Sequence, residues 1–125
     1  MTHQKNTTVL VVADHDLSRD LFCQVLKSAG YAVRAVSDGI NAIRHMEETR
    51  FDVVLADLSM PQMDGLELLS KIRDRWPDSR VVLHSNLLTW RVARLARVEG
   101  AYACLSKSDN TSQLLKTIAS ASSTA

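Results

Sequence analysis

The chain has 125 residues, of which 46 % are hydrophobic and 23 % are charged, with a formal net charge of +1. This size and composition are typical of one soluble globular domain, and the near-neutral charge predicts no general attraction to nucleic acids or membrane surfaces. The first residues, MTHQKNTT, lack the apolar segment of a signal peptide, and no apolar run approaches the roughly 18 residues that span a bilayer. We therefore expect a cytoplasmic protein.

Short apolar runs alternate along the chain with stretches of helical periodicity. The runs predict strands at residues 9–13, 32–36, 51–56, 80–84 and 101–105. Helices are expected to begin near Leu17, Asp38, Gly65, Trp90 and Thr111. Regular alternation of this kind predicts an α/β fold, a doubly wound five-stranded parallel sheet with helices on both faces.

One domain accounts for nearly the whole chain. We expect residues 1–7 to be a disordered N-terminal segment and residues 8–120 to form the domain. The small polar residues 121–125 are expected to be a frayed tail or the start of a linker. Cys23 and Cys104 lie inside apolar patterns, which favours two buried thiols over a disulfide.

The chemistry-bearing residues lie where the predicted strands end. Asp14, Asp57, Ser85 and Lys107 follow or close the first, third, fourth and fifth strands. In an open parallel sheet, ligands bind beyond the carboxyl ends of the strands, so these four side chains should converge on one edge.

This set of side chains predicts a particular ligand chemistry. Two carboxylates, Asp14 and Asp57, would repel each other unless a hard cation such as Mg²⁺ lay between them. The ammonium of Lys107 and the hydroxyl of Ser85 suit a tetrahedral anion such as a phosphoryl group. Asp57 would then be the nucleophile, since a carboxylate can form an aspartyl phosphate.

The segment VVLADLSMPQMDGLELL, around Asp57, resembles the phosphoacceptor segment of bacterial two-component response-regulator receiver domains, the CheY-like family. The resemblance implies a flavodoxin-like (βα)5 fold, with Asp57 as phosphoacceptor and Ser85 and Lys107 binding the phosphoryl group. It also implies a Mg²⁺ cofactor held by Asp14, Asp57 and the backbone carbonyl of Ser59.

The same resemblance implies a signalling protein that takes part in a phosphorelay and is not a turnover enzyme. The phosphoryl group would come from a sensor histidine kinase or a phosphotransfer protein. Phosphorylation would then change the surface formed by the fourth helix, fifth strand and fifth helix, and so control an output domain or effector protein.

The sequence departs from the family pattern at several positions. Ala13 replaces the first of two adjacent acids, which should weaken Mg²⁺ binding unless Asp16 compensates. Cys104 replaces an aromatic residue of the switch, and Tyr102, expected on the same strand face, could stand in for it. Leu87 cannot orient an attacking water, so we expect slow self-dephosphorylation.

Two further features each have two interpretations. His84 is interpreted as a partly buried, hydrogen-bonded histidine, with a pH- or partner-sensitive element as the alternative. The fourth helix begins with an apolar patch and carries a basic stripe, which is either a solvated face or a partner surface. This candidate surface consists of Trp90, Arg91, Arg94, Arg97 and Tyr102. We expect no direct contact with nucleic acid and no membrane contact. A homodimer is a further candidate assembly.

Two other functions compete with the phosphorylatable receiver. A degenerate receiver would act as a phosphorylation-independent protein-interaction module, which Ala13, Cys104 and Ser108 favour. An aspartyl-phosphate phosphatase would need a second acid where Ser59 lies, and a cap domain for which the chain has no room.

Overall fold

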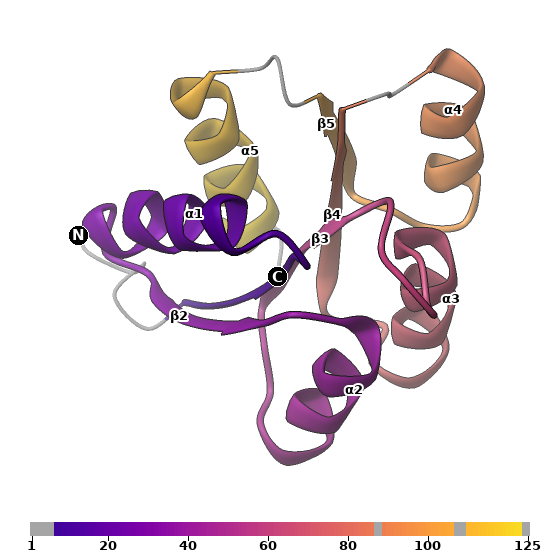
Figure 1. The fold of residues 1–125 in the computed structure, drawn as a ribbon, viewed down its shortest axis with the longest axis horizontal. Coiled ribbons are helices and arrows are strands. Elements are labelled where there is room, and N and C mark those ends of the chain that lie inside the picture. The colour runs from indigo at the N-terminus through magenta and orange to yellow at the C-terminus, as the bar shows by residue number, and fades with distance from the viewer. Residues whose placement is uncertain (1–6, 87–88, 107–109, 124–125) are drawn as a thin grey trace.

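Five strands alternate with five helices in the computed structural model, which describes residues 7–86, 89–106 and 110–123. Figure 1 shows their arrangement. The elements in chain order are β1 (Thr8–Val12), α1 (Asp16–Ser28), β2 (Ala32–Val36), α2 (Gly39–Glu48), β3 (Val53–Asp57), α3 (Gly65–Arg75), β4 (Arg80–Ser85), α4 (Trp90–Val98), β5 (Ala103–Ser106) and α5 (Thr111–Ser123).

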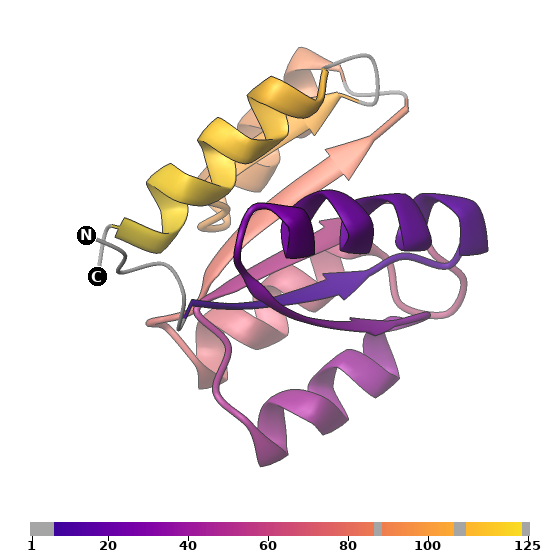
Figure 2. The ribbon, with the colours of Figure 1, turned by 90° about the vertical axis from the view of Figure 1, so that its left-hand side faces the viewer.

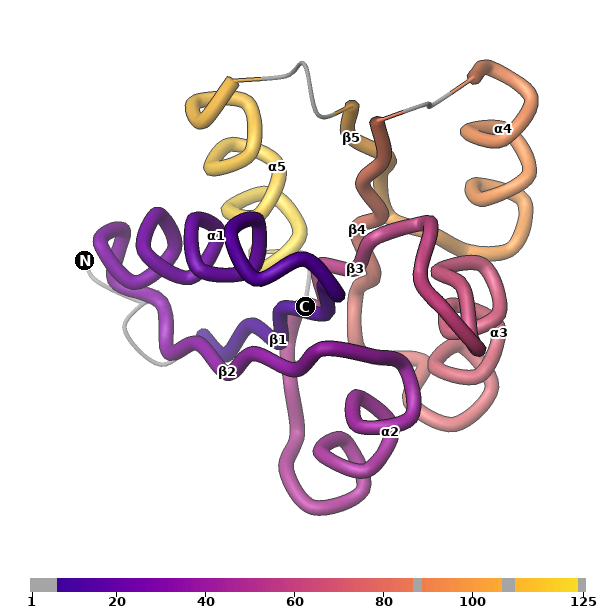
Figure 3. Tube along the Cα trace, viewed as in Figure 1, coloured from indigo at the N-terminus to yellow at the C-terminus, as the bar shows by residue number. Residues whose placement is uncertain are grey.

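The strands form a single sheet in the order β2-β1-β3-β4-β5, and every pairing is parallel. Their carboxyl ends therefore lie at one edge, where the arrowheads gather in Figure 2. Helices α1 and α5 cover one face, and α2, α3 and α4 cover the other, as the Cα trace also shows (Figure 3). The predicted doubly wound five-stranded parallel sheet is confirmed.

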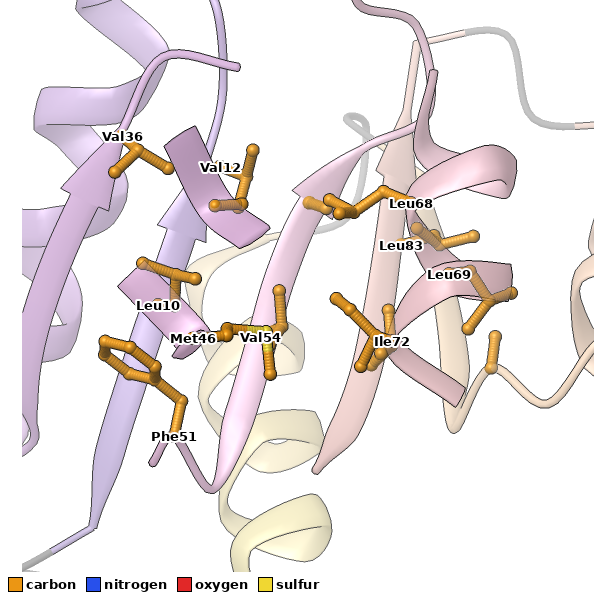
Figure 4. Close-up of a cluster of buried hydrophobic side chains, with 14 of the residues drawn as sticks. Leu10, Val12, Val36, Met46, Phe51, Val54, Leu68, Leu69, Ile72 and Leu83 are labelled. Atoms are coloured by element: carbon orange, nitrogen blue, oxygen red, sulfur yellow. The ribbon is translucent and has the colours of Figure 1, made fainter. Parts of the chain in front are cut away.

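Each face of the sheet has its own apolar core. Along β3, Val53 and Leu55 face α1 and α5, whereas Val54 faces α2 and α3. Figure 4 shows the cluster that contains Val54, to which Phe51 and Met46 also belong. Because both faces are covered, residues 9–12 of β1 and residues 53–56 of β3 are apolar in succession instead of alternating.

Side-chain caps fix where four of the helices begin. The side chains of Asp38, Asp64, Thr89 and Asn110 accept hydrogen bonds from backbone N–H groups in the first turns of α2, α3, α4 and α5. An N-cap residue satisfies a donor that has no partner inside the helix. This is why these helices begin within one residue of the expected positions.

The structure differs from the sequence-based expectations at the C-terminal end. β5 begins at Ala103, after a bend at Tyr102, so the strand alternation does not extend back to that residue. Tyr102 packs with the α1–α5 cluster and Cys104 with the opposite one, so the expectation that they share a face is wrong. α5 continues to Ser123, so residues 121–123 are helical where a tail was expected.

The two cysteines are free thiols and are only half-buried, less than the sequence indicated. Burial raises the pKa of the Cys104 thiol above its usual value, although the nearby Arg97 lowers it in part. Burial likewise raises the pKa of Cys23. Within the described ranges, no helix is long and apolar enough to cross a membrane.

Candidate functional site

The carboxyl edge of the sheet holds a cavity of about 290 Å³. Asp57 and Ser85 close β3 and β4, and Asp14 follows β1 by two residues. These three side chains border the cavity together with residues of the adjoining loops. Its lining consists of Asp14, His15, Asp57, Ser59, His84, Ser85 and Asn86. Three of the four strand-end residues selected from the sequence therefore meet at one place, and Lys107 lies outside the described residues.

The two carboxylates of the cavity differ in burial. Asp57 is only 6 % exposed, whereas Asp14 is exposed at the rim. Ser85 is also buried, beside Asp57 on the neighbouring strand. A recessed carboxylate with an exposed one at the rim gives the site an opening through which a cation or a phosphoryl donor can enter.

The loop between β3 and α3 returns very close to the strand that it leaves. The Leu58 N–H donates to the His84 carbonyl over 2.9 Å, and the Gly65 N–H donates to the Leu58 carbonyl over 2.8 Å. A Cβ atom at position 65 would lie 2.5 Å from the Asp57 carbonyl oxygen, so only glycine fits here. Gln62, within the same loop, adopts a left-handed backbone with a φ of 69°. The start of α3 is thus tied directly to the backbone of Asp57.

His84 is the residue of the site whose partner the sequence did not predict. It is the register partner of Asp57 in the adjacent strand, and its Nδ1 lies 2.7 Å from Oδ1 of Asp57. It is 4 % exposed, more buried than the expectation of a partly buried histidine. A hydrogen bond was predicted for His84, but not its partner. The contact follows from the register of β3 and β4, because residues paired across parallel strands place their side chains on the same face.

Asp16 does not take the place of the acid that is missing at Ala13. Its carboxylate forms an ion pair with Arg19 at 2.5 Å, and it is not among the residues that line the cavity. The same guanidinium donates to the Ala13 carbonyl over 2.8 Å. The Ala13 side chain is buried. Asp14 and Asp57 are therefore the two carboxylates at this cavity.

The donor atoms of the cavity suit a hard divalent cation. Asp14, Asp57 and Ser59 offer oxygen atoms only, which Mg²⁺ prefers, and Mg²⁺ normally keeps several waters. In the described ranges there is no group of three or more acidic, histidine or cysteine side chains that could hold a metal. The lining nevertheless offers oxygen donors of the kind that Mg²⁺ binds.

Four of the five residues of the candidate partner surface lie together on α4. On α4, Trp90 is 70 % exposed, and the guanidinium of Arg91 lies over its ring at 5.6 Å. Arg94 and Arg97 are exposed on the same helix. Tyr102 is not part of this group, since its hydroxyl lies 2.5 Å from Ser120 Oγ on α5. The four α4 residues form an exposed aromatic and basic surface without Tyr102.

Known proteins are similar to this chain in both fold and sequence. A family model described as the response regulator receiver domain matches residues 9–119. The sensor histidine kinase RcsC of Salmonella typhi is 35 % identical over 112 residues, which cover 89 % of this chain but 12 % of the kinase.

Solved structures of known proteins are also similar to this chain. The chemotaxis protein CheY4 of Vibrio cholerae has a TM-score of 0.87 at 28 % identity, covering 93 % of this chain and 98 % of that one. A CheX–CheY–BeF3–Mg²⁺ complex from Borrelia burgdorferi gives a TM-score of 0.86 at 26 % identity, covering 91 % of this chain and 87 % of that one.

Proposed function

The chain belongs to the response regulator receiver domain family of two-component signalling, and we propose that it accepts a phosphoryl group on Asp57. The observation that carries this proposal is the cavity at the carboxyl edge of the sheet. There a buried carboxylate ends the central strand, beside a serine hydroxyl and a second, exposed carboxylate. The donor would be the phosphohistidine of a sensor histidine kinase or a phosphotransfer protein.

The transfer needs little from the protein beyond positioning and charge. An Asp57 carboxylate oxygen attacks phosphorus, and the bond from phosphorus to the histidine nitrogen breaks with its electron pair left on that nitrogen. The Ser85 hydroxyl, in the same cavity, is suited to donate to a phosphoryl oxygen. Lys107 would pair with the same group, as the family resemblance implies.

Mg²⁺ is the cofactor that this donor set suits. Asp14, Asp57 and the Ser59 carbonyl would hold it, and when bound it neutralises charge on the phosphoryl oxygens. With Ala13 in place of an acid and Asp16 paired to Arg19, we expect weaker Mg²⁺ binding than three acids would give.

The output would pass to a partner through α4. Trp90, Arg91, Arg94 and Arg97 present an aromatic ring and three positive charges, which suit an acidic effector or output domain. A second copy of the chain is the other candidate partner. We also propose that residues 8–120 form the receiver unit, with α5 continuing past it to Ser123.

A degenerate receiver that binds partners without phosphate is the second candidate function. Two observations favour it: the alanine at position 13 and the hydrogen bond that already occupies an oxygen of Asp57. The two functions differ in one measurable property, the capacity of Asp57 to gain a phosphoryl group.

Intact-protein mass after incubation with acetyl phosphate tests the proposal. We expect a gain of about 80 Da that requires Mg²⁺, the mass of one added phosphoryl group. Asp57→Asn should remove the gain, whereas Asp78→Asn, at an exposed aspartate away from the cavity, should retain it. No gain in the unmodified chain under any metal condition would replace this function with the interaction module.

A further inference from the structure

We propose that His84 is a positioning residue that holds Asp57 in a resting state and must release it before phosphorylation. The proposal rests on the function above and deepens it, because it names the group that regulates the acceptor. The contact between an imidazole and the acceptor carboxylate is the feature on which it depends.

The contact is built into the sheet. Asp57 and His84 are register partners on β3 and β4, so their side chains emerge side by side on one face. Nδ1 of His84 lies 2.7 Å from Oδ1 of Asp57, and both side chains are less than a tenth exposed. At this distance and burial, water does not compete effectively for the carboxylate oxygen.

The direction of the bond follows from the chemistry of the two groups. An ionised carboxylate can only accept, so the imidazole donates from Nδ1, which a neutral ring in that tautomer and a charged ring both do. Phosphorylation converts the carboxylate into an acyl phosphate, whose carbonyl oxygen is a neutral acceptor and whose negative charge lies on the phosphoryl oxygens. A hydrogen bond from His84 to that carbonyl oxygen is weaker than one to a charged carboxylate. His84 therefore stabilises Asp57 before the reaction more than after it, and so opposes the reaction.

The imidazole also has space into which it can move. The Phe22 ring of α1 packs against it edge-on, with the ring centroids 4.5 Å apart. His84 borders the site cavity and a second cavity of about 170 Å³ between α1 and α5, whose walls include Phe22, Val25 and Leu114. Once released from Asp57, the ring can turn toward this second cavity and carry Phe22 with it. Phosphorylation would thereby alter the α1–α5 side of the domain.

Three variants at two adjacent positions of β4 test the proposal. His84→Val removes the donor, and His84→Asn keeps an N–H donor near the place of Nδ1. Leu83→Val disturbs the same strand on the opposite face and serves as the packing control. The readouts are the rate of phosphorylation by acetyl phosphate, followed by intact mass, and the Mg²⁺ affinity, measured by NMR titration of backbone amides.

We expect His84→Val to be phosphorylated about fivefold faster than the unmodified chain. This factor reflects the difference in strength between a hydrogen bond to a charged acceptor and one to a neutral acceptor. Its Mg²⁺ affinity should also rise. The phosphorylation rate and Mg²⁺ affinity of His84→Asn and Leu83→Val should stay close to those of the unmodified chain. A His84→Val rate that is unchanged or slower would overturn the proposal, as would His84→Asn behaving like His84→Val.

Failure of the underlying function gives a different result. If no variant gains mass, the proposed phosphoacceptor function fails. The Mg²⁺ titration then tests the positioning role of His84 by itself. Tighter binding in His84→Val but not in His84→Asn supports the positioning role. Equal binding in all variants refutes it.

Discussion

Gly65→Ala should destabilise the domain strongly because the first turn of α3 lies against the backbone of Asp57. The added Cβ would lie 2.5 Å from the Asp57 carbonyl oxygen and 2.8 Å from the Leu58 Cα. Both are backbone atoms, so no side chain can rotate away to relieve the contact. The start of α3 has to move instead, which strains the 2.8 Å hydrogen bond from the Gly65 N–H to the Leu58 carbonyl.

The magnitude combines two terms. Overpacking of a well-packed site costs about 1–3 kcal/mol, and a weakened hydrogen bond adds about 0.5–1.5 kcal/mol. Gly65 is the first residue of α3, so the preference of a helix interior for alanine does not offset this cost. The free energy of unfolding should therefore fall by about 1.5–4.5 kcal/mol.

Gly39→Ala is a matched control at the start of α2. There the added Cβ would lie 2.7 Å from the Met63 Sδ, which belongs to a flexible side chain. Met63 can move aside, so we expect a change within about 1 kcal/mol of the unmodified chain. Urea unfolding, followed by circular dichroism, measures both variants. Equal stability of the two variants would refute the reasoning that backbone contact at Gly65 sets the loop.

Other predictions follow from single features of the structure. Gln62→Gly should raise the free energy of unfolding by about 0.5–1 kcal/mol, because its left-handed φ of 69° suits glycine; urea denaturation checks this, and an equal gain in Gln62→Ala would contradict it. Asp64→Ala should lower the same quantity by about 1 kcal/mol through loss of the α3 cap, and Asp64→Ser should restore most of it. Iodoacetamide should label Cys104 more slowly than a free cysteine at the same pH, because burial raises its pKa and leaves less thiolate. The labelling rate should rise with pH and on unfolding in urea, and a rate equal to that of free cysteine in the folded protein would argue against this.

The fold could be predicted from the sequence because local signals and burial agree. The apolar runs of β1 and β3 lack alternation, as strands covered on both faces should. The expected starts of α3, α4 and α5 agree with the structure, and caps at Asp64, Thr89 and Asn110 explain them. Tyr102 was placed wrongly because a bend before β5 interrupts the two-residue period, and nothing local in the apolar run marks that bend.

The candidate site could be predicted as a location, but not as a set of contacts. Asp14, Asp57 and Ser85 converge on one cavity because parallel strands place their ends together. The hydrogen bond from His84 depends on the register between β3 and β4, which connects residues far apart in the chain. Register across a parallel pair is set by tertiary packing, so the sequence alone indicated a hydrogen-bonded histidine without its partner.

The central claim is that Asp57 is the phosphoacceptor, and locating the phosphoryl group on the chain tests it most directly. Borohydride reduces an aspartyl phosphate to homoserine, which peptide sequencing by mass spectrometry assigns to one position. After incubation with acetyl phosphate and Mg²⁺, we predict homoserine at position 57. Homoserine at position 14 or at another aspartate, with none at 57, would contradict the account.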